Sequence, residues 1–241
     1  MKIAVTILAC ALAALSSCES PNPPTPRNET VVLLHGLMRN AASMKPIGER
    51  LRSEGYTVIN HDYPSRDDRI EEIVSSSIEP LMDRKEVTDA EHVHFVTHSM
   101  GGILVRRLMQ TRRPPNLGRV VMLGPPNHGS DVVDEIGHWS LFSWINGPAG
   151  QQLGTGANGL PETLGPVDYP VGVIAGDRSI NWINSAMITG PDDGKVSVES
   201  SKLDGMTDHI VVHRTHPMMM RSGEVIDLVV QFLQNGSFGA N

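Results

Sequence analysis

Six short runs of apolar and β-branched residues recur along the chain, and each has the length of a buried strand. Continuous apolar runs, as opposed to alternating ones, are typical of strands that are covered on both faces of a parallel sheet. The pattern therefore predicts six strands, at residues 30–34, 56–60, 92–97, 119–123, 169–175 and 208–213.

Apolar residues at helical spacing lie between these runs. Pro46 suits the first turn of one helix, and Gly236 follows the last turn of another. Because strands alternate with helices, we expect an α/β fold of about six mostly parallel strands with helices on both faces. The predicted helices span residues 46–53, 70–81, 103–110 and 225–235.

Segment 131–165 has no sheet pattern and interrupts this alternation. It carries Trp139, Phe142 and Trp144 together with many glycines. We expect it to form a short cap insertion on a single domain that spans residues 30–238, since 241 residues suffice for one large core. The three aromatic side chains could line a ligand pocket or pack the cap onto the domain.

The N-terminal residues are typical of a targeting segment. Lys2 precedes an apolar run that is too short to span a bilayer, which predicts a signal peptide at residues 1–17. The run ends in Leu-Ser-Ser-Cys18, which resembles the bacterial lipobox and predicts that Cys18 carries lipid and attaches the protein to a membrane. An ordinary signal peptide followed by an incidental cysteine is the alternative.

Residues 18–29 contain four prolines and would form an extended tether between the anchor and the domain. The expected location is the bacterial cell envelope, with the anchor in the outer membrane or at the periplasmic face; secretion is the alternative. Cys10 lies in the signal peptide and Cys18 is lipidated, so no disulfide is expected.

The charge of the chain indicates which classes of binding partner to expect. The formal net charge is −7 and the sequence pI is about 5.8, and no basic stripe is visible. A nucleic-acid partner is therefore not expected. The sequence indicates no oligomeric state.

Ser99 lies between the predicted strand 92–97 and the predicted helix 103–110, and Gly101 and Gly102 follow it. This context resembles the nucleophile elbow of hydrolases, a sharp strand-to-helix turn that exposes a serine and needs small neighbours. Thr97 stands where the usual pattern has another glycine. Ser99 is the candidate nucleophile.

A second motif, His35-Gly36, follows the first predicted strand directly. In such a fold this loop lies beside the turn that carries the serine, so backbone amides there can face a substrate carbonyl oxygen. We assign a candidate oxyanion hole to the amides of Leu37 and Met100. A plain strand-to-loop glycine is the alternative.

A serine hydroxyl needs a general base, and the base needs a carboxylate that orients it. In the hydrolase order the histidine comes last in the chain. We favour His216, which lies in the loop between the last strand and the last helix, whereas His209 and His213 lie at the ends of a predicted strand.

Two carboxylates are candidates for the acid. Asp177 follows a predicted strand directly, and Asp193 lies later, in a Pro-Asp-Asp-Gly turn in which Asp192 is interpreted as a turn residue. Position in the sequence does not separate Asp177 from Asp193.

The span 31–238 resembles small bacterial lipases and esterases of the α/β-hydrolase superfamily. Several lipases place their acid in an Asn-Asp-Gly-hydrophobic motif followed by two serines, and the stretch from Asp193 to Ser201 is similar, so the resemblance favours Asp193 and supports His216. The disulfide of the larger lipases is absent. The matching segments are 34–38, 60–65, 97–102, 124–129, 192–197 and 213–219.

Together these features predict a serine hydrolase that cleaves carboxylic esters, lipids among them, through an acyl-enzyme on Ser99. No cofactor is expected, because the chemistry of the triad needs none. No metal is expected either: His92 and His94 lack the further ligands that a zinc site needs, and no calcium site of the larger lipases can be read in the sequence. The alternatives are an acyltransferase that uses the same triad, and a non-catalytic surface protein that binds a partner on a hydrolase fold.

Overall fold

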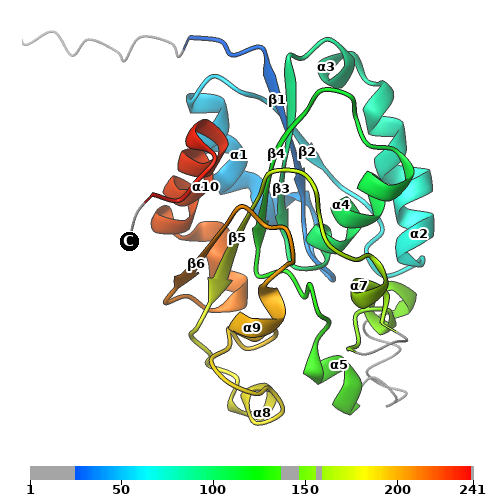
Figure 1. Ribbon diagram of the computed structural model, residues 1–241, viewed down its shortest axis with the longest axis vertical. Coiled ribbons are helices and arrows are strands. Elements are labelled where there is room, and N and C mark those ends of the chain that lie inside the picture. The colour runs from blue at the N-terminus through cyan, green and yellow to red at the C-terminus, as the bar shows by residue number, and fades with distance from the viewer. Residues whose placement is uncertain (1–24, 137–146, 156–158, 240–241) are drawn as a thin grey trace, which may run out of the picture.

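The computed structural model describes residues 25–136, 147–155 and 159–239. At its centre is a six-stranded sheet in the order β2-β1-β3-β4-β5-β6, in which every neighbouring pair is parallel (Figure 1). The predicted parallel sheet is therefore confirmed. The strands are β1 (Glu29–Leu34), β2 (Thr57–His61), β3 (His92–His98), β4 (Leu117–Leu123), β5 (Val171–Gly176) and β6 (Asp208–Val212).

Three longer helices pack on the sheet, and shorter helical turns lie in the connections. The longer ones are α1 (Lys45–Ser53), α4 (Met100–Thr111) and α10 (Gly223–Asn235). The shorter α-helices are α2 (Ile70–Ile73), α3 (Lys85–Thr88), α5 (Asp131–Ile136), α7 (Leu160–Thr163), α8 (Trp182–Ser185) and α9 (Val198–Ser201). The remaining helical turns are η1 (Ala41–Met44), η2 (Val74–Ile78), η3 (Glu79–Asp83) and η4 (His216–Arg221).

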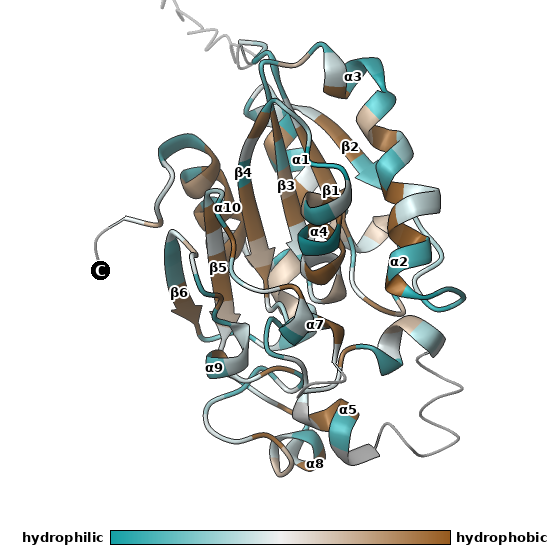
Figure 2. Cartoon of the chain, turned by 45° about the vertical axis from the view of Figure 1, so that its right-hand side comes forward, coloured by the Kyte–Doolittle hydropathy of each residue, from teal (hydrophilic) through white to brown (hydrophobic). Residues whose placement is uncertain are grey.

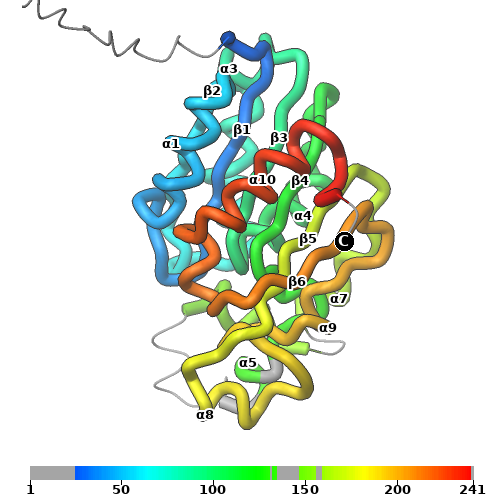
Figure 3. Tube along the Cα trace, turned by 90° about the vertical axis from the view of Figure 1, so that its left-hand side faces the viewer, coloured from blue at the N-terminus to red at the C-terminus, as the bar shows by residue number. Residues whose placement is uncertain are grey.

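Helices cover both faces of the sheet because successive strand residues point to opposite sides. Val31 and Leu33 of β1 belong to the core beneath α1 and α10, whereas Val32 and Leu34 belong to the core beneath α2 and α4. Figure 3 shows α1 and α10 side by side over one face, and Figure 2 shows the apolar strands between helices with polar outer surfaces. Burial on both faces explains why the strands are continuous apolar runs in the sequence.

The predicted helix at 70–81 is wrong in type beyond its first turn. The structure has α2, then the π-helical η2, then the 3₁₀-helical η3. Ser75 and Ser76 donate their hydroxyls to the carbonyl of Glu72, and Pro80 has no N–H to continue an α-helical ladder. Apolar residues still reach the core, so the spacing located the segment although the hydrogen bonding differs.

The carboxyl ends of the six parallel strands lie along one edge of the sheet. Figure 1 shows α5, α7, α8 and α9 beyond this edge. The part of the expected cap that the structure describes comprises α5, a helical stretch at 147–151 and α7.

Several expectations fall on residues outside the described ranges. These are the signal peptide at 1–17, Cys18 with most of the tether, and the aromatic residues Trp139, Phe142 and Trp144. Within the described ranges, no helix has the length and apolar character needed to cross a membrane.

Candidate active site

Ser99 occupies a strained turn between β3 and α4. Its backbone has φ 54° and ψ −125°, a conformation that residues other than glycine rarely adopt and that often occurs at functional sites. The helix begins at the next residue, Met100. Gly101 permits this geometry, because a Cβ there would lie 2.7 Å from the carbonyl oxygen of Leu34 and 2.9 Å from that of His35. Thr97, in place of the usual glycine, is fully buried.

His216 and Asp193 meet beside this turn. Nδ1 of His216 donates to Oδ2 of Asp193 at 2.7 Å, and the amide of His216 donates to the carbonyl of Asp193 at 2.9 Å. Both residues are buried, and His216 lines the same pocket as Ser99. Gly124, with φ 53°, lets the loop after β4 approach them: a Cβ there would lie 2.9 Å from Oδ2 of Asp193 and 3.1 Å from Nδ1 of His216.

The other candidates from the sequence lie elsewhere. Asp177 binds His213 at 2.8 Å in a pair whose imidazole is exposed, and among the described residues it forms no hydrogen bond with His216. His209 lies 3.2 Å from the hydroxyl of Ser201. Asp192 accepts from the amide of Gly194 at 2.7 Å, as a turn residue does, so it shapes the loop that presents Asp193.

The loop after β1 is held by the loop after β2. The hydroxyl of Tyr63 donates to the carbonyl of His35, and the two rings stack with centroids 4.0 Å apart. The hydroxyl of Ser65 accepts from the amide of Met38 at 3.2 Å, and Met38 has a left-handed φ of 58°. Within the described residues, the amide of Leu37 has no acceptor in the protein, which leaves it available to a ligand.

Met100 supplies the second amide of the expected oxyanion hole. It is the first residue of α4, where backbone N–H groups have no intrahelical acceptor and the helix dipole favours negative charge. Leu37 lines the pocket, and so does Ser99, which directly precedes Met100. Both amides of the expected oxyanion hole therefore lie beside one cavity.

His98, which precedes Ser99, supports the loop that carries His216. Its Nε2 donates to the carbonyl of His216 at 3.0 Å, and the two rings lie 4.6 Å apart. Burial, and then the charge that a protonated His216 would carry, hold the pKa of His98 well below its ordinary value. His98 is therefore a neutral donor that positions His216.

A pocket of about 390 Å³ opens over Ser99 and His216. Most of its wall is apolar and comes from the loop after β1, the loop after β4, α5 and the loop that carries Asp193. The lining residues are Leu37, Met38, Arg39, His98, Ser99, Pro126, Ser130, Val132, Val133, Leu153, Lys195, Val196 and His216. Its size and apolar wall suit an acyl chain.

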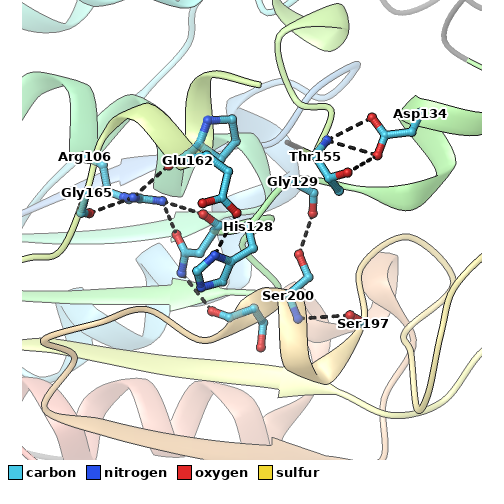
Figure 4. Close-up of polar contacts among 12 residues, drawn as sticks. Arg106, His128, Gly129, Asp134, Thr155, Glu162, Gly165, Ser197 and Ser200 are labelled. Carbon is cyan, nitrogen blue, oxygen red and sulfur yellow. Dashed lines mark hydrogen bonds and ion pairs between the residues drawn. The ribbon is translucent and has the colours of Figure 1, made fainter. Parts of the chain in front are cut away.

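Buried polar contacts fix the wall of this pocket (Figure 4). Arg106, on α4, donates to the carbonyls of Asn127 at 2.8 Å, Pro161 at 2.9 Å and Gly165 at 2.9 Å. Burial lowers the pKa of Arg106 to about 10. The hydroxyl of Ser200 also reaches the carbonyl of Gly129, so the loop after β4 is tied to α4, α7 and α9.

Sequence reasoning did not assign roles to several of these residues. Tyr63 and Ser65 lie in the matching segment 60–65, but the resemblance implies no role for either residue. Arg39 follows the His35-Gly36 motif and Lys195 lies in the matching segment 192–197, but neither segment predicts a role for the cation, and the place of both residues in the pocket follows only from the folded loops. Among the described residues, no group of three His, Cys, Asp or Glu side chains is arranged to hold a metal ion.

Comparison with known proteins gives one match in sequence and several in structure. The sequence profile described as "Alpha/beta hydrolase family" matches residues 31–226. No curated protein sequence matches the chain.

Solved structures share the fold at low identity. A mature lipase of Bacillus licheniformis matches with TM-score 0.67 and 20% identity over 89% of this chain and 94% of that one. An esterase of Pyrococcus furiosus matches with TM-score 0.61 and 18% identity over 86% and 81%. The phospholipase PlaB of Legionella pneumophila matches with TM-score 0.58 and 20% identity over 72% of this chain and 45% of its own.

Proposed function

The chain belongs to the alpha/beta hydrolase family, and from this premise we propose that it is a serine hydrolase that cleaves carboxylic esters. The observation that carries the proposal is the 2.7 Å contact of buried Asp193 with His216, which lines the same pocket as Ser99 on its strained turn. The structural neighbours named lipase, esterase and phospholipase support the same class of reaction.

In the proposed reaction, Oγ of Ser99 bonds to the acyl carbon while Nε2 of His216 takes its proton. The amides of Leu37 and Met100 donate to the oxyanion of the tetrahedral intermediate. The ester C–O bond then breaks, and His216 returns the proton to the leaving alkoxide. Water, activated by the same histidine, releases the acid and restores Ser99.

Asp193 has a positioning role in this scheme. Because its carboxylate accepts from Nδ1 of His216, the neutral imidazole carries its proton on Nδ1 and leaves Nε2 free to act as base. Asp193 is itself fixed by the amides of Lys195 and Val196, which donate to Oδ1 at 3.0 and 2.9 Å.

Turnover of p-nitrophenyl esters from acetate to palmitate tests the proposal and orders the acyl lengths. The Ser99→Ala variant must lose this turnover while it retains the parent circular dichroism spectrum. A matched control is Ser43→Ala, a half-buried serine on η1 whose hydroxyl binds only the carbonyl of Asn40. Near-parent turnover by folded Ser99→Ala would overturn the proposal, and ester formation on addition of an alcohol would identify acyl transfer instead.

The proposed location is the cell envelope, with Cys18 lipidated after removal of residues 1–17, and with 18–29 as tether to the domain at 30–238. The support is the Leu-Ser-Ser-Cys18 sequence after a short apolar run. Cys18→Ala should move the protein from the membrane fraction to the soluble fraction or block its processing. Unchanged detergent-dependent fractionation and unchanged mass of the mature N-terminus would overturn this assignment.

A further inference from the structure

Among the described residues, the charged side chains that line the pocket are all positive. The chain as a whole carries a formal charge of −7, yet the described residues that line the pocket include Arg39 and Lys195 and no carboxylate. Asp193 lies nearby but is only 2% exposed, and its oxygens are occupied by His216 and by backbone amides. A substrate that enters the pocket therefore meets positive charge.

Both cations belong to loops that also carry the proposed catalytic groups. Arg39 ends the turn in the loop after β1 that contains Leu37, and its amide donates to the carbonyl of Gly36 at 3.2 Å. Lys195 lies two residues after Asp193, and its amide donates to that carboxylate. The backbone of each cation is therefore held by a hydrogen bond within the loops that form the site.

Neither cation has a counter-ion within the described parts of the chain. Elsewhere on the surface arginines are commonly paired, as Arg112 is with Asp83 and Arg113 with Asp168. The side chains of Arg39 and Lys195 are exposed at the pocket, and neither forms an ion pair with any described residue.

The two charges also act on one another. Loss of surrounding water lowers the pKa of Lys195; the negative charge of Asp193 raises it, and the positive charge of Arg39 lowers it further. Arg39 is therefore within electrostatic range of Lys195. The positive charge of Arg39 opposes that of Lys195 although Asp193 offsets part of the effect, and an anion bound between the two cations would be attracted to both.

We propose that the ester cleaved at Ser99 carries an anionic group, a phosphate or a carboxylate, that binds between Arg39 and Lys195. The guanidinium offers paired donors that match the oxygens of either group, and the ammonium adds a compact positive charge. The apolar wall formed by Val132, Val133 and Leu153 remains for the acyl chain. This inference rests on the proposed function, since it concerns the substrate of the same serine.

Matched pairs of esters test the inference. Dihexanoylglycerol 3-phosphate is compared with dihexanoylglycerol, and hexanoyloxyacetate with 2-methoxyethyl hexanoate, with hexanoate release as the readout. The parent protein should show a higher kcat/KM for the anionic member of at least one pair, and added salt should reduce the preference. The pair that shows the preference identifies phosphate or carboxylate as the recognised group.

The double variant Arg39→Gln/Lys195→Gln should lower the anionic-to-neutral ratio of kcat/KM by about tenfold or more, because two charge-assisted contacts are lost. The control Arg52→Gln/Lys85→Gln removes two exposed positive charges on α1 and α3 and should keep the parent ratio. The inference is overturned if the parent shows no anionic preference in either pair, if the ratio survives in the double variant, or if the control loses it equally. Failure of the proposed function has a different signature, namely neutral-ester turnover that persists in Ser99→Ala.

Discussion

Replacing Asp193 by asparagine tests how the histidine is held, because the two oxygens of this carboxylate have different partners. Oδ1 accepts from the amides of Lys195 and Val196, whereas Oδ2 accepts from Nδ1 of His216. An asparagine must keep its oxygen toward the two backbone amides, since an NH₂ group there would face two donors. Its NH₂ group then faces Nδ1 of His216, which can accept only when it carries no proton.

The substitution therefore reverses the tautomer of His216. With Nδ1 unprotonated, the neutral ring carries its proton on Nε2, and that nitrogen cannot take the proton of Ser99. We expect kcat to fall about ten-thousandfold, the loss known for the same change in a serine protease triad, which corresponds to about 5 kcal/mol in the barrier. The backbone contacts of residue 193 persist, so the fold should remain.

The assay is kcat for p-nitrophenyl butyrate, with thermal unfolding as a check on the fold. Asp177→Asn is the control, because Asp177 pairs with the exposed His213, and surface pairs of this kind contribute little. It should keep kcat within about twofold of the parent. The reasoning is refuted if folded Asp193→Asn stays within about tenfold of the parent, or if Asp177→Asn loses more than Asp193→Asn.

Three further perturbations follow from the contacts around the site. Tyr63→Phe should lower the free energy of unfolding by about 1–3 kcal/mol in urea denaturation, because the buried carbonyl of His35 loses its donor; an unchanged midpoint would contradict this. Gly124→Ala should lower kcat about tenfold or more with the protein still folded, because the new methyl group would press on the Asp193–His216 pair; parent-like kcat would show that the loop yields. Burial lowers the pKa of a group of histidines in the folded protein. The unfolded chain therefore binds protons first as the pH falls below about 6.5. The free energy of unfolding should fall there by up to about 1.4 kcal/mol per pH unit for each histidine. Urea denaturation at about pH 7.5 and about pH 5 measures this, and equal or greater stability in acid would contradict it. The buried histidines are His35, His94 and His98, and the partly exposed His61 and His209 contribute less because solvent screens them.

The sheet could be predicted from the sequence because its strands are buried on both faces. A continuous apolar strand such as Val31 to Leu34 is stable only where both of its faces are buried, as they are in the middle of this sheet. The elbow could be located for a similar reason, since a serine followed by Gly101 marks a close approach of helix to strand. Spacing alone did not reveal the π and 3₁₀ turns after Ile73, which depend on serine hydroxyls and Pro80.

The choice between Asp177 and Asp193 could not be made from position, because both lie on loops near the same edge of the sheet. It depends on a turn in which Asp192 accepts from Gly194 and so presents the next carboxylate to His216. The place of Lys195 in the pocket depends on that turn as well. Long-range placement by loops of this kind leaves no periodic signal in the sequence.

Labelling by a fluorophosphonate tests the central claim most directly, because the reagent reacts with a serine only when a neighbouring base activates it. Intact mass and peptide mass spectrometry locate the adduct. The account predicts a single adduct on Ser99, its absence in Ser99→Ala, and much slower labelling in His216→Ala. The absence of any adduct on the folded parent protein, or an adduct that persists in Ser99→Ala, would contradict the account.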